Sequence, residues 1–452
     1  MSDAVVAEAE GPAVPIQLVG DAEVPVAMAA LAPPLRAQAE AARFKGKTGE
    51  VAALAGEAGL ARVLAGLGDG AGAMALRGLP AKLAPGLYRL EPREGAPPAA
   101  DVALAFAVGA YRFDRYKAHH GEPGAQLAAP EGLDLAELTA VVHACALARD
   151  MINTPAADMG ARQIETIARE VAEAFGAEIS VVVGDDLIEG GYPAVHAVGR
   201  AAIPERAPRM IEISWGEAGR PLIVLVGKGV VFDTGGLDIK PAAGMRTMKK
   251  DMGGAAHALA LGRMVMAAKL PVRLAVLLPV AENAIAGDAM RPGDILNSRK
   301  GLTIEVGNTD AEGRLILADA LARAAELAPA LTIDLATLTG AARTAVGPEI
   351  APFYTDDDGL AAQIEAAARA TEDPVWRMPL WSPYESALDS DIADLKNDPD
   401  PLGAGRLDHR GAVPAALRPQ GRLGPLRHLR LESPQSPRLA RGRGGAGDPW
   451  PL

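Results

Sequence analysis

The sequence predicts an α/β protein whose main sheet is largely parallel. The first observation is that strand-like and helix-like segments alternate regularly from residue 164 to residue 335, as in layered α/β folds. The second is that polar candidate site residues follow three of the predicted strands, which end near residues 226, 306 and 335. Ligands of α/β folds collect at the carboxyl ends of strands. The length of 452 residues is enough for about two to three domains.

The first 150 residues are predicted to form a domain of their own. Residues 54–67 have the apolar spacing of a helix, whereas residues 87–90 and 101–108 are apolar runs between Gly and Pro, which predicts strands. Residues 133–153 predict a long helix that Pro155 ends. We therefore expect a domain boundary near residue 150.

Residues 151–400 carry the regular alternation of elements. The apolar spacing predicts helices at residues 164–175, 251–268 and 314–327. It predicts strands at residues 178–183, 210–214, 222–226, 272–280, 303–306 and 331–335. This order of elements is the basis of the predicted α/β fold.

The composition changes abruptly at residue 401. From there to residue 452 the chain has nine Arg, no Lys, three acidic residues and eight Pro, and the apolar periodicity disappears. One interpretation is a basic, disordered tail. The other, which the abruptness favours, is that the coding frame shifted near residue 400.

The overall composition excludes several classes of protein. A net charge of −12 argues against a general nucleic-acid surface. The single cysteine, Cys145, excludes an internal disulfide framework and a cysteine-based zinc site. No basic residue precedes Arg36, as a secretory leader would require, and no apolar run approaches the roughly 18 residues that span a membrane. We expect a cytoplasmic protein without a membrane or nucleic-acid partner.

The stretch Asn-Thr-Asp-Ala-Glu-Gly-Arg, residues 308–314, has the highest density of chemical groups. In an extended segment, side chains two residues apart share a side, so Asp310, Glu312 and Arg314 would point into one space. Two carboxylates there repel each other, and a divalent cation between them would relieve the repulsion. Arg314 would hold an anion at the edge. The alternative is a solvated acidic turn, since short patterns of this kind also occur by chance.

A second set of polar residues follows the strand predicted at residues 222–226. Lys228 lies between two glycines, Asp233 and Lys240 come later in the same loop, and Asp251 opens a predicted helix. The loop lacks the spacing GxxxxGK[ST] of a phosphate-binding loop, so its glycines instead allow close approach of the backbone to a ligand. Taken singly, each lysine also fits a surface position, and Asp251 fits a helix cap.

Taken together, three aspartates, a glutamate and two lysines at strand ends and a helix start predict a site for two divalent cations. Such a pair shares a bridging carboxylate. A lysine ligates a metal only when it is neutral, a form that the charge of the cation favours. Oxygen and amine ligands accept Zn, Mn, Mg or Co, so the ligand types do not select the metal.

Five segments of the chain resemble the leucyl aminopeptidase family, the dizinc cytosol aminopeptidases of peptidase family M17. They are VGKGVVFDTGGLDIKP, KKDMGGAAHALA, AENAIAGDAMRPGDIL, GLTIEVGNTDAEGRLILADAL and IDLATLTGA. NTDAEGRL is the hallmark of the family. The resemblance implies a small amino-terminal α/β domain at residues 1–150, a catalytic domain with a mixed, largely parallel sheet flanked by helices at residues 151–400, and a homohexamer.

The resemblance also implies two metal sites that share ligands. One metal would be bound by Lys228, Asp233, Asp251 and Glu312. The other would be bound by Asp233, Asp310 and Glu312. The metals would be Zn or Mn, with Mg or Co as alternatives.

The remaining roles that the resemblance implies concern the substrate. Lys240 would polarise the substrate carbonyl and stabilise the oxyanion, and Arg314 would hold a bicarbonate-like anion that acts as general base. Asp251 would also anchor the free α-amino group, while Thr337 and Leu338 would line the substrate backbone. The implied function is a metal-dependent aminopeptidase that releases amino-terminal residues, leucine among them, from peptides.

The tail at residues 401–452 departs from the family pattern. Family members end with elements that shape the side-chain pocket, and these are not recognisable here. One alternative is therefore a catalytically impaired homologue that acts as a binding protein, since some family members regulate transcription on DNA. The acidity of the chain argues against it, and the Arg-rich tail is its support. Another alternative is an inactive product of a damaged gene.

Overall fold

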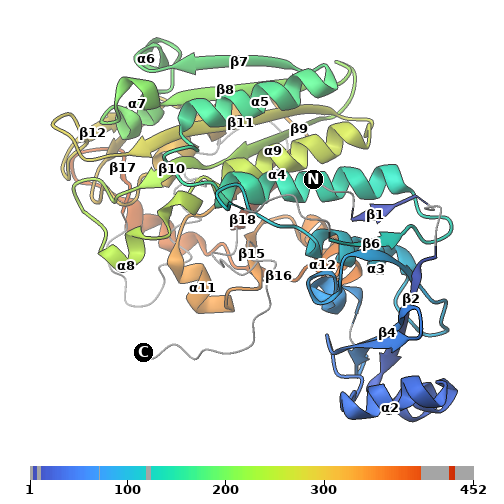
Figure 1. Cartoon of the computed structure of the whole chain (residues 1–452). Coiled ribbons are helices and arrows are strands. Elements are labelled where there is room, and N and C mark those ends of the chain that lie inside the picture. The colour runs from blue at the N-terminus through green and yellow to red at the C-terminus, as the bar shows by residue number, and fades with distance from the viewer. Residues whose placement is uncertain (1–3, 8–11, 71, 119–123, 399–426, 433–452) are drawn as a thin grey trace. The chain divides into compact units, whose positions relative to one another are not determined.

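The computed structural model describes residues 4–7, 12–70, 72–118, 124–398 and 427–432 (Figure 1). The chain divides into two compact units between Ala146 and Leu147, close to the boundary expected near residue 150. Helix α4 (Leu135–Asn153) runs through the division without a break. Its bounds agree with the helix predicted at residues 133–153.

The first unit is built on a six-stranded sheet in the order β1-β6-β5-β2-β4-β3. Its strands are β1 (Val5–Val6), β2 (Val14–Gly20), β3 (Val51–Gly56), β4 (Gly59–Gly68), β5 (Gly86–Leu90) and β6 (Ala125–Ala128). All neighbours are parallel except β3 and β4. The helices of this unit before α4 are α1 (Val24–Ala30), α2 (Pro33–Ala41) and α3 (Ala99–Gly109). Val102 and Phe106 of α3 share a buried core with Ile16 and Leu127 of the sheet.

The sequence prediction was wrong for two elements of the first unit. Residues 54–67, predicted as a helix, form most of the hairpin of β3 and β4, which turns at Gly59 with a φ of 121°. The second half of β4 is buried without interruption, so no polar residue marks the period of two. Residues 101–108, predicted as a strand, lie in α3. Periodicity alone does not separate a buried helix from a buried strand.

The second unit is built on a nine-stranded mixed sheet in the order β16-β15-β18-β14-β9-β11-β8-β7, with β10 paired to β11. Its strands are β7 (Glu178–Val183), β8 (Arg209–Trp215), β9 (Leu222–Gly227), β10 (Gly229–Asp233), β11 (Arg273–Asn283), β14 (Leu331–Ala336), β15 (Ala351–Tyr354), β16 (Val375–Met378) and β18 (Arg427–Glu432). The central neighbours β11, β9, β14 and β18 are parallel, whereas β7, β8 and β11 are antiparallel. The predicted α/β class and the mixed sheet of the second domain are confirmed.

Helices cover both faces of this sheet. They include α5 (Ala161–Phe175), α7 (Pro193–Gly199), α9 (Gly253–Ala267) and α10 (Gly313–Glu326). Leu277 of β11 shares a buried cluster with α7 and α10, whereas its neighbour Val276 faces Gly262 of α9. Alternate residues of a strand point to opposite faces, so α9 covers one face, with α5 beside it (Figure 1). Helices α7 and α10 cover the other face. All elements predicted between residues 164 and 335 are confirmed to within three residues at their ends.

A small third sheet joins segments far apart in the chain. Its strands are β12 (Ile295–Asn297), β13 (Thr303–Glu305) and β17 (Leu395–Lys396). Strand β17 pairs in parallel with β13, so residues 397–398 lie beside the loop that follows β13. The arrangement connects the end of the second unit with the stretch at residues 308–314.

Most of the Arg-rich tail, at residues 401–426 and 433–452, lies outside the described residues. The exception is β18, which lies between β14 and β15. The predictions of a disordered tail and of a frame shift stay predictions. In the described part of the chain, no helix combines the length and the apolar character that crossing a membrane requires.

Candidate metal centre

The polar residues at the strand ends meet at one edge of the second sheet. Lys228 directly follows β9, Asp233 ends β10, and Thr337 directly follows β14. Strands β9, β10 and β14 run in the same direction, so their carboxyl ends lie at the same edge. Asp310 and Glu312 reach this edge from the loop between β13 and α10. The arrangement follows the general rule for ligand sites of α/β sheets.

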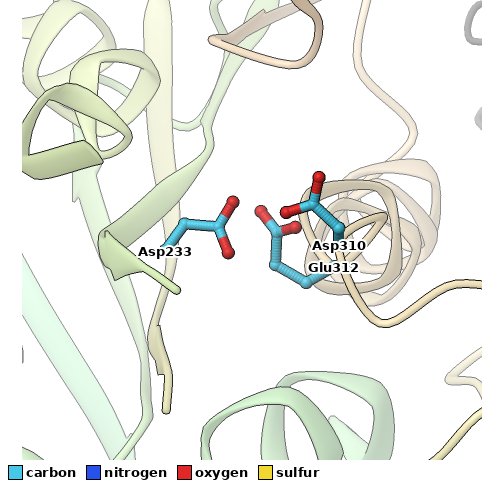
Figure 2. A group of neighbouring side chains, drawn as sticks. All are labelled: Asp233, Asp310 and Glu312. Atoms are coloured by element: carbon cyan, nitrogen blue, oxygen red, sulfur yellow. The ribbon is translucent and has the colours of Figure 1, made fainter. Parts of the chain in front are cut away.

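Three carboxylates form the centre of the site (Figure 2). Asp233, Asp310 and Glu312 each offer an oxygen, and the three oxygens lie within 4.8 Å of one another. Figure 2 shows Asp233 facing the other two carboxylates across one small space. Asp233 and Glu312 are 2% and 1% exposed, whereas 36% of the Asp310 side chain is exposed. Carboxylates this close raise the energy of one another's ionised form unless positive charge lies among them.

Lys228 provides a buried positive charge. Its ammonium nitrogen lies 2.6 Å from Asp251 Oδ2 and 2.9 Å from Glu312 Oε1, and the residue is 3% exposed. The stem of the lysine passes over Gly313, where a Cβ would lie only 2.4 Å from Lys228 Cε. Glycine at position 313 is therefore a steric requirement of this lysine.

Lys240 provides a second positive charge at the opposite side of the group. Its Nζ lies 2.8 Å from Asp233 Oδ2 and also contacts Asp310 Oδ1. The loop that carries it contains Gly235, which has a φ of 89°, and a Cβ there would lie 2.5 Å from Asp238 O. This glycine allows the tight backbone path that brings the lysine to the carboxylates.

Asp251 lies between the 3₁₀ turn η5 (Met248–Lys250) and α9. Its Oδ1 accepts a hydrogen bond from the Thr337 hydroxyl at 2.9 Å and lies 2.8 Å from Lys250 Nζ. Thr337, expected beside the substrate, thus contacts Asp251 directly. Leu338, the other residue expected there, packs against the hydrophobic core that includes α10.

The segment at residues 310–314 is not extended, so that part of the sequence interpretation was wrong. Thr309 and Asp310 form a turn, in which the Asp310 N–H donates to Asn308 Oδ1 at 2.8 Å. Arg314 already belongs to α10, is 1% exposed, and donates from Nη1 to Asn397 O at 2.5 Å. Asp310 and Glu312 nevertheless converge, because the turn and the helix start bring them together.

The clustered charges shift one another's pKa values. Burial lowers the pKa of Lys228, but the neighbouring carboxylates, Asp251 first, raise it more, and the net shift is upward. The pKa of Lys240 shows the same balance, with Asp233 as its main partner. Burial raises the pKa of Glu312, and the charge of Asp233 raises it further. Burial also acts upward on the pKa of Asp251, but its two lysine neighbours outweigh it and hold that pKa below the usual range.

The donor atoms of the site are of the type that binds divalent cations. Within this group of side chains, the buried carboxylate oxygens Asp251 Oδ2, Asp310 Oδ1 and Glu312 Oε1 lack a hydrogen bond of good geometry. Their close polar neighbours are the lysine ammonium groups. Their lone pairs are not committed to backbone N–H groups, and hard cations prefer such oxygens. The structure brings together the five residues predicted as metal ligands, and the three carboxylates at the centre could hold a metal ion.

Two buried asparagines of the site are not among the residues predicted from the sequence. Asn283, the last residue of β11, donates from Nδ2 to Asp233 Oδ1 at 2.9 Å and to Thr309 O at 3.1 Å. Its place at a strand end is the same pattern that indicated Asp233. Asn397 follows β17 and contacts the loop at residues 307–311. No local pattern marks it, because its partners lie about 90 residues earlier.

Two protein-family models match the sequence. The model described as "Cytosol aminopeptidase family, catalytic domain" matches residues 146–417. The model described as "M17 aminopeptidase, N-terminal domain" matches residues 14–130. The catalytic-domain match begins one residue before the division between Ala146 and Leu147, and the N-terminal match ends at residue 130, inside the first unit.

Known proteins agree with the family models. Probable cytosol aminopeptidases from Roseiflexus castenholzii and Rhizobium meliloti are each 40% identical to the chain, over 66% and 70% of it. The chain spans slightly less than two thirds of these relatives, 64% and 65% of their lengths. The crystal structure of a cytosol aminopeptidase from Coxiella burnetii is similar, with a TM-score of 0.88 and 39% identity over 95% of this chain and 93% of that one. The bottromycin maturation enzyme BotP in complex with Mn has a TM-score of 0.81 and 32% identity, over 92% and 91% of the two chains.

Proposed function

This chain belongs to the cytosol aminopeptidase family, and we propose that it removes amino-terminal residues, leucine among them, from peptides in a metal-dependent reaction. The observation that carries the proposal is the convergence of four carboxylates and two lysines from separate segments on one buried site. If the cluster were only structural, its carboxylates and lysines would stay paired with one another permanently. If it is a binding site, these groups exchange one another for a ligand.

The proposed metal ligands form two overlapping sets. Lys228, Asp233, Asp251 and Glu312 would hold one divalent cation. Asp233, Asp310 and Glu312 would hold the other. When bound, such a pair polarises a carbonyl and lowers the pKa of a water molecule. Of the metals that these donors accept, Mn has the support of BotP, which was solved in complex with Mn, and Zn, Mg and Co are the alternatives.

The other residues of the site would act on the peptide itself. The Lys240 ammonium, which is 15% exposed, would donate hydrogen bonds to the scissile carbonyl oxygen as negative charge develops on it. Asp251 would bind the free α-amino group, and the Thr337 hydroxyl orients its carboxylate. Arg314 would hold a bicarbonate-like anion that accepts the proton of the attacking water. Leu338 would line the substrate backbone next to Thr337.

We extend the proposal to the assembly and the location of the protein. Family membership supports a homohexamer that acts on peptide substrates. The name of the relatives, cytosol aminopeptidase, supports a cytoplasmic location. The DNA-binding alternative depends on the Arg-rich tail, and the net charge of −12 argues against it.

Hydrolysis of a leucyl chromogenic amide tests the proposed function. We expect Mn²⁺-loaded protein to release the chromophore, a chelator to stop the release, and added Mn²⁺ to restore it. The matched control is the N-acetylated form of the same amide, which we expect to stay intact because Asp251 then has no ammonium group to bind. Release that continues in the chelator, or equal release from the acetylated amide, would contradict the proposal. Absence of release from fully loaded protein would favour the impaired homologue.

A further inference from the structure

Asn397 is the most completely hydrogen-bonded side chain near the proposed metal centre. It follows β17 and is 0% exposed. Its Oδ1 accepts from the N–H groups of Gly307 and Asn308, at 2.8 and 3.2 Å. Its Nδ2 donates to the carbonyl oxygens of Asn308 and Ala311, at 2.8 and 3.3 Å. A primary amide has two donors and room for two hydrogen bonds at its oxygen, so the loop at residues 307–311 uses its full capacity.

The backbone of Asn397 also bonds to the residues that precede and follow this loop. Its N–H donates to Glu305 O at 2.9 Å, which continues the pairing of β13 with β17. Its carbonyl oxygen accepts from Arg314 Nη1 at 2.5 Å. One residue therefore holds the strand before the loop, the loop itself and the first turn of the helix after it.

Three further contacts hold Thr309 in the middle of the loop: its N–H donates to Asp238 Oδ2 at 2.8 Å, its hydroxyl donates to Gly235 O at 2.6 Å, and its carbonyl oxygen accepts from Asn283 Nδ2 at 3.1 Å. Asn397 differs from these partners because it bonds to the loop on both sides of Thr309, at residues 307, 308 and 311. Residues 307–312 belong to no helix or strand, and Asp310, with 36% of its side chain exposed, lies at the turn. Loops without regular hydrogen bonding are more mobile than the elements they connect. Asp310 and Glu312 must meet Asp233 within a few tenths of an ångström for a cation to bind all three.

We propose that Asn397 is a positioning residue of the metal centre, which fixes the loop at residues 307–311 so that Asp310 and Glu312 face Asp233. The inference depends on the proposed function, since it assigns Asn397 a role in cation binding. Residues that orient metal ligands alter metal affinity by about 10- to 100-fold when they are replaced. The hydrogen bond from Arg314 to the carbonyl oxygen of Asn397 would also hold Arg314 in place beside the site.

Asparagine is the side chain that suits this position. An aspartate has the same shape but no N–H groups, so its second oxygen would face the carbonyl oxygens of Asn308 and Ala311. A serine is too short to reach both sides of the loop, but it removes no backbone contact and adds no charge. Aspartate thus loses the two bonds that Nδ2 donates and keeps the two that Oδ1 accepts, whereas serine weakens all four.

The test compares Asn397→Asp and Asn397→Ser with a control in the same segment, Asp394→Ala. The Asp394 carboxylate accepts from the Thr303 N–H and hydroxyl, both at 2.8 Å, and so attaches β17 to β13 without contacting the loop. Mn²⁺ affinity is measured by titration, and amide hydrogen exchange is measured on peptides that contain residues 307–311. We expect the Asn397 variants to bind Mn²⁺ about 10- to 100-fold more weakly and to exchange faster in the loop. We expect Asp394→Ala to lower the melting temperature and to keep its Mn²⁺ affinity.

The outcomes separate the inference from the proposed function. Wild-type protein that binds no Mn²⁺ contradicts the proposed function, and the inference with it. Wild-type protein that binds Mn²⁺ together with Asn397 variants of unchanged affinity contradicts the inference alone. An equal loss in Asp394→Ala also overturns it, because the effect would then come from detachment of β17. If Asn397→Asp does not fold, Asn397→Ser decides between these outcomes.

Discussion

Two buried acidic groups, one directly before helix α10 and one within it, are stabilised in different ways. Glu312, the residue before the helix, lies 2.9 Å from the Lys228 ammonium, and its Oε1 lacks a hydrogen bond of good geometry. Asp319, about two turns further along, is 0% exposed. Its carboxylate accepts three backbone N–H groups, from Ala194 at 2.8 Å, Val195 at 3.2 Å and Arg299 at 2.8 Å. The first group faces side-chain cations, and the second faces fixed backbone donors.

The difference indicates which buried acid takes part in binding. Burial raises the pKa of both Glu312 and Asp319, so a raised pKa does not separate the two. The backbone fixes the N–H groups of Ala194, Val195 and Arg299 in place. Asp319 therefore joins α7 and the segment at Arg299 to α10 permanently. The Lys228 ammonium, in contrast, loses its charge when it gives up a proton to become a metal ligand, so a cation can replace it as the positive partner of Glu312. We therefore propose that Glu312 is part of a binding site and that Asp319 belongs to the framework around it.

The largest effect that this comparison predicts concerns Glu312→Gln. The amide removes the charge shared by both proposed cation sites, and we expect hydrolysis of the leucyl amide to fall by at least about 10³-fold. The fold should change little, because glutamine has the same shape. Steady-state kinetics, metal analysis of the purified protein and thermal unfolding measure the three quantities.

The control for this variant is Asp319→Asn, which makes the same chemical change within helix α10. We expect it to keep its metal content and its activity per folded molecule. A near-wild-type rate in Glu312→Gln would remove Glu312 as a shared ligand. Loss of bound metal in Asp319→Asn would show that the two acids are not separated in the way proposed.

The next largest effect is on stability, in Asp319→Ala. This change leaves three buried N–H groups without a partner, and each unsatisfied donor costs about 1–3 kcal/mol. We expect the free energy of unfolding to fall by about 3 kcal/mol, as measured with urea. The folded fraction should still bind Mn²⁺ with wild-type affinity. A loss of stability below about 0.5 kcal/mol would mean that water replaces the carboxylate, and Asp319 would then not be a framework residue.

The sequence indicates those parts of the molecule that local patterns determine. Residues 178–183 and 222–226 are apolar runs between turn residues, and they are strands as predicted. Lys228 and Asp233 were identified because a polar residue after a buried strand lies at the ligand edge of such a sheet. The alternation of elements thus predicts both the layers of the second unit and the place of its site.

Other parts depend on contacts that no local pattern contains. Residues 54–67 are rich in Ala, Gly and Leu, and only the partners of β4 on both sides decide that they form strands. Asn397 receives its role from a loop about 90 residues earlier in the chain. The turn at Thr309 and Asp310 was missed for the same reason, because Asn397 and Asn308 hold it in a shape that the residues alone do not indicate.

The smallest predicted effect is a pH dependence of stability that belongs to Asp319. Burial raises its pKa from 3.8 to about 7, and the three backbone N–H groups limit the rise. At pH 5 the folded state therefore holds a proton that the unfolded state has lost. This contribution to stability is complete below about pH 4 and is lost as the pH rises through 7.

Asparagine has no such proton, so the stability difference between wild type and Asp319→Asn isolates the effect. We expect the advantage of the wild type to shrink by on the order of 2 kcal/mol between pH 5 and pH 8, from urea unfolding at each pH. Contributions from other titrating groups cancel in the difference, since the two proteins share them. If the advantage grew with pH instead, the three N–H groups would stabilise the ionised carboxylate more than burial destabilises it. Asp319 would then carry a charge held by backbone dipoles alone, and the contrast with the lysine-paired Glu312 would become sharper.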